Sequence, residues 1–106
     1  KIRYIEIFSK QEMESAIECI EDFFEGEFEG CTLKQISYVG DDKNIDYIEY
    51  ATKNNAEKAV AFSSAFDVGA LGEQNGFIPY STESDWTWIL VLKNDGTWEV
   101  VNYGNG

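Results

Sequence analysis

The sequence predicts an α+β domain in which a curved antiparallel sheet packs on one long N-terminal helix. Three observations lead to this prediction: an apolar stripe of helical period over residues 10–24, a strand pattern over residues 31–39, and two aromatic strands joined by a tight turn near the C-terminal end. A helix or sheet that is apolar on one side becomes stable by packing that side against another element. A helix followed by a run of strands is typical of the α+β class.

The N-terminal helix has a recognisable start and one apolar face. Ser9 and Glu12 match the S-x-x-E capping box, in which each side chain accepts a hydrogen bond from the backbone N–H of the other. Gly26 predicts the end of the helix. Residues 1–8 read as an extended arm or a short strand that leads into the cap. The apolar stripe consists of Met13, Ala16, Ile17, Ile20, Phe23 and Phe24.

The opposite face of the predicted helix is acidic. Like charges four residues apart destabilise a helix slightly, and acids near its C-terminal end oppose the helix dipole. Packing of the apolar stripe therefore has to outweigh both effects. Two interpretations stay open: a patch that docks a basic partner, or a solvated surface whose repulsion is screened by salt. The acidic face comprises Glu14, Glu18, Glu21, Asp22 and Glu25.

The middle of the chain predicts two strands with a short helix between them. Residues 31–39 read as a strand whose apolar phase changes between Leu33 and Ile36, which indicates a bulge. A short helix is expected to begin near Asp41 and to end at residues 54–55. Residues 56–66 alternate as a strand does, although their alanines also allow a helix.

A long loop and a hairpin are predicted for the rest of the chain. Residues 67–85 carry glycines and the single proline, and they are expected to be either a functional loop or a cover over a sheet edge. Residues 86–93 and 98–103 are rich in aromatic and β-branched side chains, and the Asn94-Asp95-Gly96 turn joins them into a hairpin.

Composition predicts one domain over residues 1–106 and restricts its partners. With 43% hydrophobic and 15% aromatic residues, the chain can form a core and does not match a disordered acidic segment. A net charge of −12 repels phosphate backbones, so we expect no nucleic-acid binding. No run of about 18 apolar residues occurs, which predicts no insertion into a membrane. A basic protein or a cationic ligand is the partner that the charge favours, and monomer and dimer stay open.

The absence of histidine excludes the Ser-His-Asp and Cys-His arrangements and removes the commonest metal ligand. No metal site and no cofactor are predicted. The residues from Asp42 begin like an EF-hand loop, but Tyr47 stands where that loop needs glycine and Lys53 where it needs glutamate. Carboxylates near aromatic residues can act as acids or bases after burial raises their pKa. The candidate ligand or partner residues are Tyr38, Asp46, Tyr50, Asp85, Trp88 and Tyr103.

The state of the two cysteines bears on the cellular location of the protein. Cys19 and Cys31 either form a disulfide across a short loop or remain free, partly buried thiols. A start at Lys1 instead of Met is expected for a mature chain whose leader has been removed. A disulfide would favour an extracellular or cell-envelope location, with the cytoplasm as the alternative.

Three segments carry a family resemblance: residues 28–33 (FEGCTL), 84–90 (SDWTWIL) and 98–104 (WEVVNYG). With the capped helix before them, they resemble small bacterial proteins of unknown function that have a cystatin-like cone fold, the shape shared with nuclear transport factor two and ketosteroid isomerase. The resemblance implies a cone-shaped sheet and, since many members look secreted, a place outside the cytoplasm. It implies no catalytic residue, because this superfold includes enzymes, ligand binders and interaction domains.

Three functions follow as hypotheses from these observations. A non-enzymatic binding or interaction module fits the acidic helix face and the aromatic sheet. The alternatives are a small-ligand-binding or enzymatic protein that uses a cone pocket, and an immunity-type inhibitor of a basic toxin.

Overall fold

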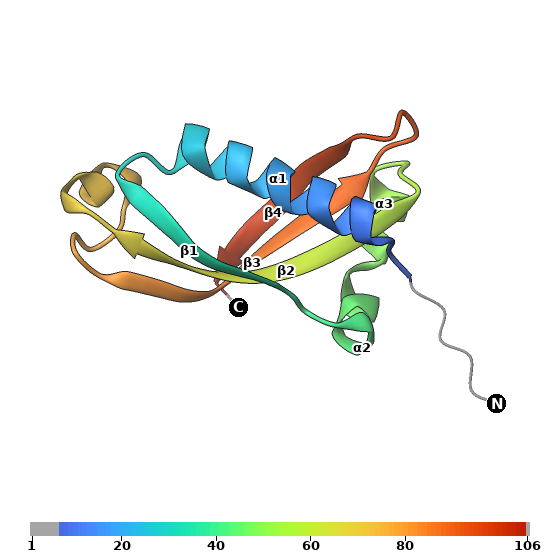
Figure 1. Ribbon diagram of the computed structural model, residues 1–106, viewed down its shortest axis with the longest axis horizontal. Helices are drawn as coiled ribbons and strands as arrows, with labels where there is room; N and C mark the ends of the chain where they lie inside the picture. The colour runs from blue at the N-terminus through green and yellow to red at the C-terminus, as the bar shows by residue number, and fades with distance from the viewer. Residues whose placement is uncertain (1–6, 106) are drawn as a thin grey trace.

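One long helix lies across a four-stranded antiparallel sheet in the computed structural model, which describes residues 7–105 (Figure 1). The sheet order β1-β2-β3-β4 follows the chain, so β1 and β4 form the two edges. These findings confirm the α+β class and the helix-on-sheet packing. The expected arm over residues 1–8 lies almost wholly outside the described residues. The main elements are α1 (Lys10–Glu27), β1 (Cys31–Tyr38), β2 (Lys58–Val68), β3 (Thr82–Leu92) and β4 (Trp98–Asn105).

The start of α1 forms the predicted capping box. Ser9 N–H donates to Glu12 Oε1 at 2.8 Å, and Glu12 N–H donates to Ser9 Oγ at 3.0 Å. Glu12 Oε1 also accepts from Lys58 Nζ at 3.0 Å, which ties the helix start to β2.

The predicted stop at Gly26 is wrong, because α1 continues through it to Glu27. The last turn is held by Phe28, whose N–H donates to Phe24 O at 2.9 Å and whose ring stacks on the Phe24 ring. The chain then turns at Gly30, which has a φ of 85°. A glycine adopts this left-handed conformation without steric cost, so the turn into β1 falls four residues later than predicted.

The segment between β1 and β2 is helical but broken into three pieces: α2 (Asp41–Asn44), η1 (Ile45–Tyr47) and α3 (Glu49–Lys53). Asn44, the last residue of α2, is buried there. Its Nδ2 donates to Ala59 O at 3.1 Å, and its Oδ1 accepts from Ala61 N–H at 2.8 Å. The side-chain amide therefore takes the place of a strand partner for β2 just beyond the end of β1. This role is structural, and the EF-hand-like opening does not form a loop here.

Residues 67–85 are not the single long loop that the sequence predicts. Strand β2 continues to Val68, β3 begins at Thr82, and η2 (Ala70–Asn75) occupies part of the connection. Asp67 and Thr82 are paired across the two strands, and Thr82 Oγ1 donates to Asp67 Oδ1 at 2.9 Å. The register shifts between Ser64 and Phe66, where β3 has one residue more than β2. In that stretch of β3 the left-handed φ of 57° at Asp85 interrupts the alternation that would identify the strand.

Other strand predictions are confirmed. The β3–β4 hairpin forms around Gly96, β1 has its bulge between Leu33 and Gln35, and residues 58–68 are a strand and not a helix. The core lies between α1 and the sheet, and a smaller cluster around Ala51 and Val91 lies under α3 on the opposite face. The largest fully buried side chains of the main core are Trp88, Phe62, Phe66, Ile20, Leu90 and Val60.

Candidate functional site

Aromatic rings fill the space between α1 and the sheet, where a cone pocket would lie. Trp88 is fully buried, and its ring lies 5.3–6.3 Å between centroids from Phe23 and Phe24 of α1, from Phe28 just after α1, and from Tyr103 of β4. Its Nε1 donates to Ser64 Oγ at 2.8 Å, and Ser64 Oγ in turn donates to Trp86 O at 3.0 Å. In the part of the chain that the structure describes, Ser64 and Asn44 are the buried polar residues and both are used in structural hydrogen bonds, whereas the buried Nε1 of Trp86 has no hydrogen-bond partner there. A core filled in this way leaves the surface for a functional site.

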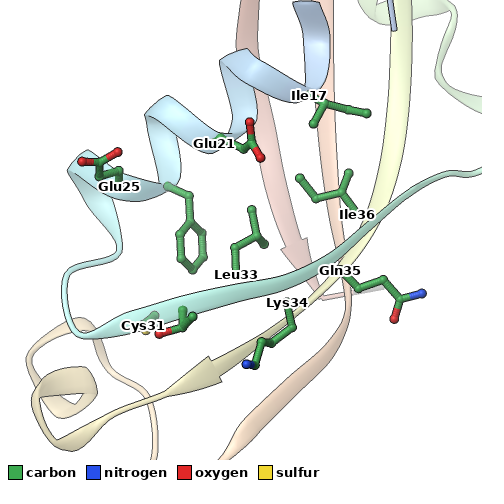
Figure 2. Close-up of a pocket in the computed structure, with 10 residues that line it drawn as sticks. Ile17, Glu21, Glu25, Cys31, Leu33, Lys34, Gln35 and Ile36 are labelled. Atoms are coloured by element: carbon green, nitrogen blue, oxygen red, sulfur yellow. The ribbon is translucent and has the colours of Figure 1, made fainter. Parts of the chain in front are cut away.

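A groove of about 420 Å³ lies between α1 and β1 (Figure 2). Its apolar lining comes from both elements. Helical spacing brings Ile17 and Phe24 to one side of α1, and the bulge between Leu33 and Gln35 brings Leu33 and Ile36, three residues apart, to the same facing side of β1. Figure 2 shows Leu33 and Ile36 pointing toward α1, whereas Lys34 points away from it. Lys34 Nζ lies 3.8 Å from Asp67 Oδ2 on the neighbouring strand.

Carboxylates stand over this apolar lining. Glu21 and Glu25 come from the same side of α1 as Ile17 and Phe24, and both border the groove. Glu83 lies close enough to Cys31, at one end of the groove, that its charge adds to the effect of burial in raising the pKa of the Cys31 thiol. The groove thus combines an apolar floor with negative charge at its rim and end.

The structure divides the predicted acidic face of α1. Glu21 and Glu25 border the α1–β1 groove, whereas Glu18 and Asp22 line a separate depression on the other side of the helix, next to the β3–β4 hairpin. Glu14 is exposed on the same helix. The face is therefore two acidic sets with different neighbours, and the Glu21–Glu25 set has the apolar surface of β1 beside it.

Both cysteines are free thiols, and the disulfide considered for them is not formed in the structure. They lie on opposite sides of α1: Cys31 lines the α1–β1 groove, and Cys19 faces β4, where its Sγ donates to Trp98 O at 3.5 Å. Burial is the main cause that raises the pKa of each thiol, and the charges of Asp22 and Glu99 add to it at Cys19.

The candidate ligand residues do not converge on one site. Trp88 belongs to the core, and the Tyr103 ring packs against it with a centroid separation of 5.3 Å while remaining 44% exposed. Asp85 is exposed, next to Tyr47 in a shallow depression. Asp46 is exposed in η1.

Two candidate tyrosines have structural hydrogen bonds. Tyr50 Oη accepts from Asn102 Nδ2 at 3.0 Å and so joins α3 to β4. Tyr38 Oη donates to Asp41 Oδ1 at 2.7 Å, and burial together with this hydrogen bond raises the pKa of Tyr38. The phenol of Tyr38 therefore stays protonated and holds the end of β1 to the start of α2.

Local sequence patterns do not identify the apolar residues of the groove as part of a site. Ile17 belonged to the predicted core stripe, and Leu33 and Ile36 were noted for the bulge alone. Their exposure depends on β1 being an edge strand, which is a property of strand order and not of any local pattern. One local pattern did indicate the groove: Glu21 and Glu25 lie at the border of the apolar stripe of the helix.

Over residues 7–105, no three potential ligand side chains come together as a group that could hold a metal ion. The described part of the chain also contains no helix with the length and apolar character needed to cross a membrane. No protein-family model, curated protein or solved structure matches this chain. The resemblance to cystatin-like proteins accordingly stays a prediction.

Proposed function

We propose that this protein is a non-enzymatic interaction module that binds a basic segment of a partner protein in the α1–β1 groove. The observation that supports this function is the pairing of an apolar lining, formed by Ile17, Leu33 and Ile36, with the carboxylates of Glu21 and Glu25. Apolar burial supplies affinity, and charge complementarity supplies rate and specificity.

A partner with lysine or arginine side chains next to apolar ones fits this surface. The whole molecule attracts such a partner, since its net charge is −12, and the rim carboxylates orient it. The cystatin-like cone is part of the same proposal, because bulges in all three strand pairs would bend the sheet around α1. A location outside the bacterial cytoplasm also remains proposed, as the resemblance implies.

The test uses a defined probe, the acetylated and amidated octapeptide VTKTVTKT, whose alternate residues are valine and lysine. Its affinity is measured by fluorescence anisotropy of a labelled copy at low salt. The variant E21K/E25K should weaken binding by about tenfold, since both rim charges then repel lysine. Added salt should weaken binding to the unaltered protein.

The matched control is E18K/D22K, which makes the same change in net charge on the same helix but on the other side from the groove. It should change the affinity by less than about twofold, because a surface charge outside the contact acts mainly through the long-range field. Equal weakening by both variants, or no saturable binding of the octapeptide, would contradict the proposed function.

A further inference from the structure

Within residues 7–105, the outer edge of β1 is open along the groove. In the sheet order β1-β2-β3-β4, β1 has a strand partner on one side only among the described residues. The backbone groups of an edge strand that face away from the sheet can pair with an added chain. Three features of the structure indicate which backbone groups are free to pair, what would cover them, and what chemistry the added chain would have.

Backbone hydrogen bonding identifies the outward-facing groups. Val39 N–H donates to Ala61 O at 3.2 Å, just beyond the end of β1. Successive residues of a strand direct their N–H and C=O groups to opposite sides, so the groups of Ser37 face β2 as those of Val39 do. Those of Ile36 and Tyr38 therefore face the open edge.

The side chains beside this edge would bury one face of an added strand. Leu33 and Ile36 point toward α1, and Ile17 lies across the groove from Ile36 (Figure 2). Every second side chain of a strand laid along β1 would enter the space below α1, in contact with these residues. The remaining side chains would lie on the face of Lys34 and Gln35, which point away from α1.

The charge of the protein favours a basic segment over a second copy of this chain at the β1 edge. A second copy of this chain would bring a further net charge of −12 to the edge and would place its own rim carboxylates close to Glu21 and Glu25. Lysine or arginine on the α1-facing side of an added strand would instead meet these two carboxylates. The bulge between Leu33 and Gln35 limits regular pairing to the part of β1 that follows it, so a short segment suffices.

We infer that the partner binds by strand addition. An extended segment, whose side chains on one face are apolar or basic, pairs with the β1 edge at Ile36 and Tyr38 and forms a fifth strand beneath α1. Backbone pairing supplies the affinity common to such segments, and alternate side chains supply the specificity. This inference rests on the proposed function and specifies how its partner is held.

Backbone methylation of the probe tests this mode without altering the protein. Two forms of the octapeptide VTKTVTKT are prepared, one N-methylated at the valines and lysines and the other at the threonines, so that each blocks the donors of one strand edge. If the peptide pairs with β1, one form should bind about tenfold more weakly than the other, because only one set of N–H groups faces the protein.

The outcomes separate the two proposals. Equal affinities of the two methylated forms, with E21K/E25K still weakening the unmethylated peptide, would overturn strand addition and leave the proposed function intact. Failure of the unmethylated peptide to bind would overturn both. A dimer in solution in which the amides of Ile36 and Tyr38 are protected from exchange without peptide would overturn the inference by assigning the edge to a second copy.

Discussion

The indole of Trp88 and the hydroxyl of Ser64 form a buried hydrogen bond of 2.8 Å in the centre of the core. This hydrogen bond links β3 to β2 below α1. Its two side chains occupy space that the cone-pocket alternative requires to be open. The same hydroxyl donates to Trp86 O at 3.0 Å, so it satisfies one donor and one acceptor. A core filled in this way leaves the surface, and first the α1–β1 groove, for function.

Ser64→Ala should lower the free energy of unfolding by about 1–3 kcal/mol, because it leaves the buried Trp88 N–H without a partner. Urea denaturation followed by tryptophan fluorescence measures this change. Ser63→Ala, one residue earlier in β2, is the control and should change the value by less than about 0.5 kcal/mol. Octapeptide affinity should be the same for both variants under native conditions, and equal stability losses would contradict the assigned role of Ser64.

The lowered pKa of Glu12 predicts that the stability of the protein depends on pH. The hydrogen bond from Ser9 N–H is the largest cause that lowers the pKa of Glu12 below its ordinary 4.5, and Lys58 adds to it. A depressed pKa in the folded state means that this stability is fully present above pH 4.5 and is lost as the pH falls through the lower folded-state pKa.

Glu12→Gln should therefore cost about 0.5–1 kcal/mol at neutral pH and flatten the acid side of the stability curve, since glutamine keeps the cap but loses the charge. The control is Ser9→Ala, which should cost about 1 kcal/mol. Because the Ser9 N–H still reaches Glu12, this control should retain most of the slope. Urea midpoints across the acid range measure both, and an unchanged slope in Glu12→Gln would contradict the account.

Gly30 should be the glycine that sets where α1 ends and β1 begins. An added Cβ at Gly30 would lie 2.8 Å from Leu71 Cβ, and its φ of 85° disfavours any other residue. Gly30→Ala should cost about 1–3 kcal/mol in the free energy of unfolding.

Gly26→Ala is the opposite control, because nothing lies within 4 Å of a Cβ added there. It should stabilise α1 by about 0.5–1 kcal/mol, as alanine does in place of glycine within a helix. Thermal and urea denaturation measure both variants, and a neutral Gly30→Ala would contradict the role assigned to Gly30.

The two thiols should react slowly and should not pair. Burial raises the pKa of Cys19 and of Cys31, so each has less thiolate at pH 7 than an exposed cysteine, and alkylation by iodoacetamide should accelerate as the pH rises. Mass spectrometry of the single variants C19S and C31S measures the alkylation rate of the cysteine that remains in each. An intramolecular disulfide after air oxidation of the native protein would contradict their placement on opposite sides of α1.

Local patterns predicted the parts of the fold that local contacts hold. The capping box of Ser9 and Glu12 and the turn at Gly96 are each formed within a few residues, and both were read from the sequence. The extensions of β2 and β3 were missed because the pairing of Asp67 with Thr82 depends on tertiary register and because Asp85 breaks the alternation.

The groove was missed for the same reason. Its apolar residues look like ordinary core residues, and only the strand order leaves Ile36 beside an open edge. The acidic residues were recognised as one helix face, whereas the structure separates Glu21 from Asp22 by placing them beside different strands.

The most direct measurement of the central claim is an NMR titration of the isotopically labelled protein with the octapeptide VTKTVTKT, in which backbone amide shifts are followed for every assigned residue. The account predicts that the largest changes fall on β1, at Ile36 and Tyr38, and on the groove side of α1, at Ile17 and Glu21. Largest changes at the β3–β4 hairpin, around Trp98, or on the opposite face of the sheet, around Asp85, would contradict it.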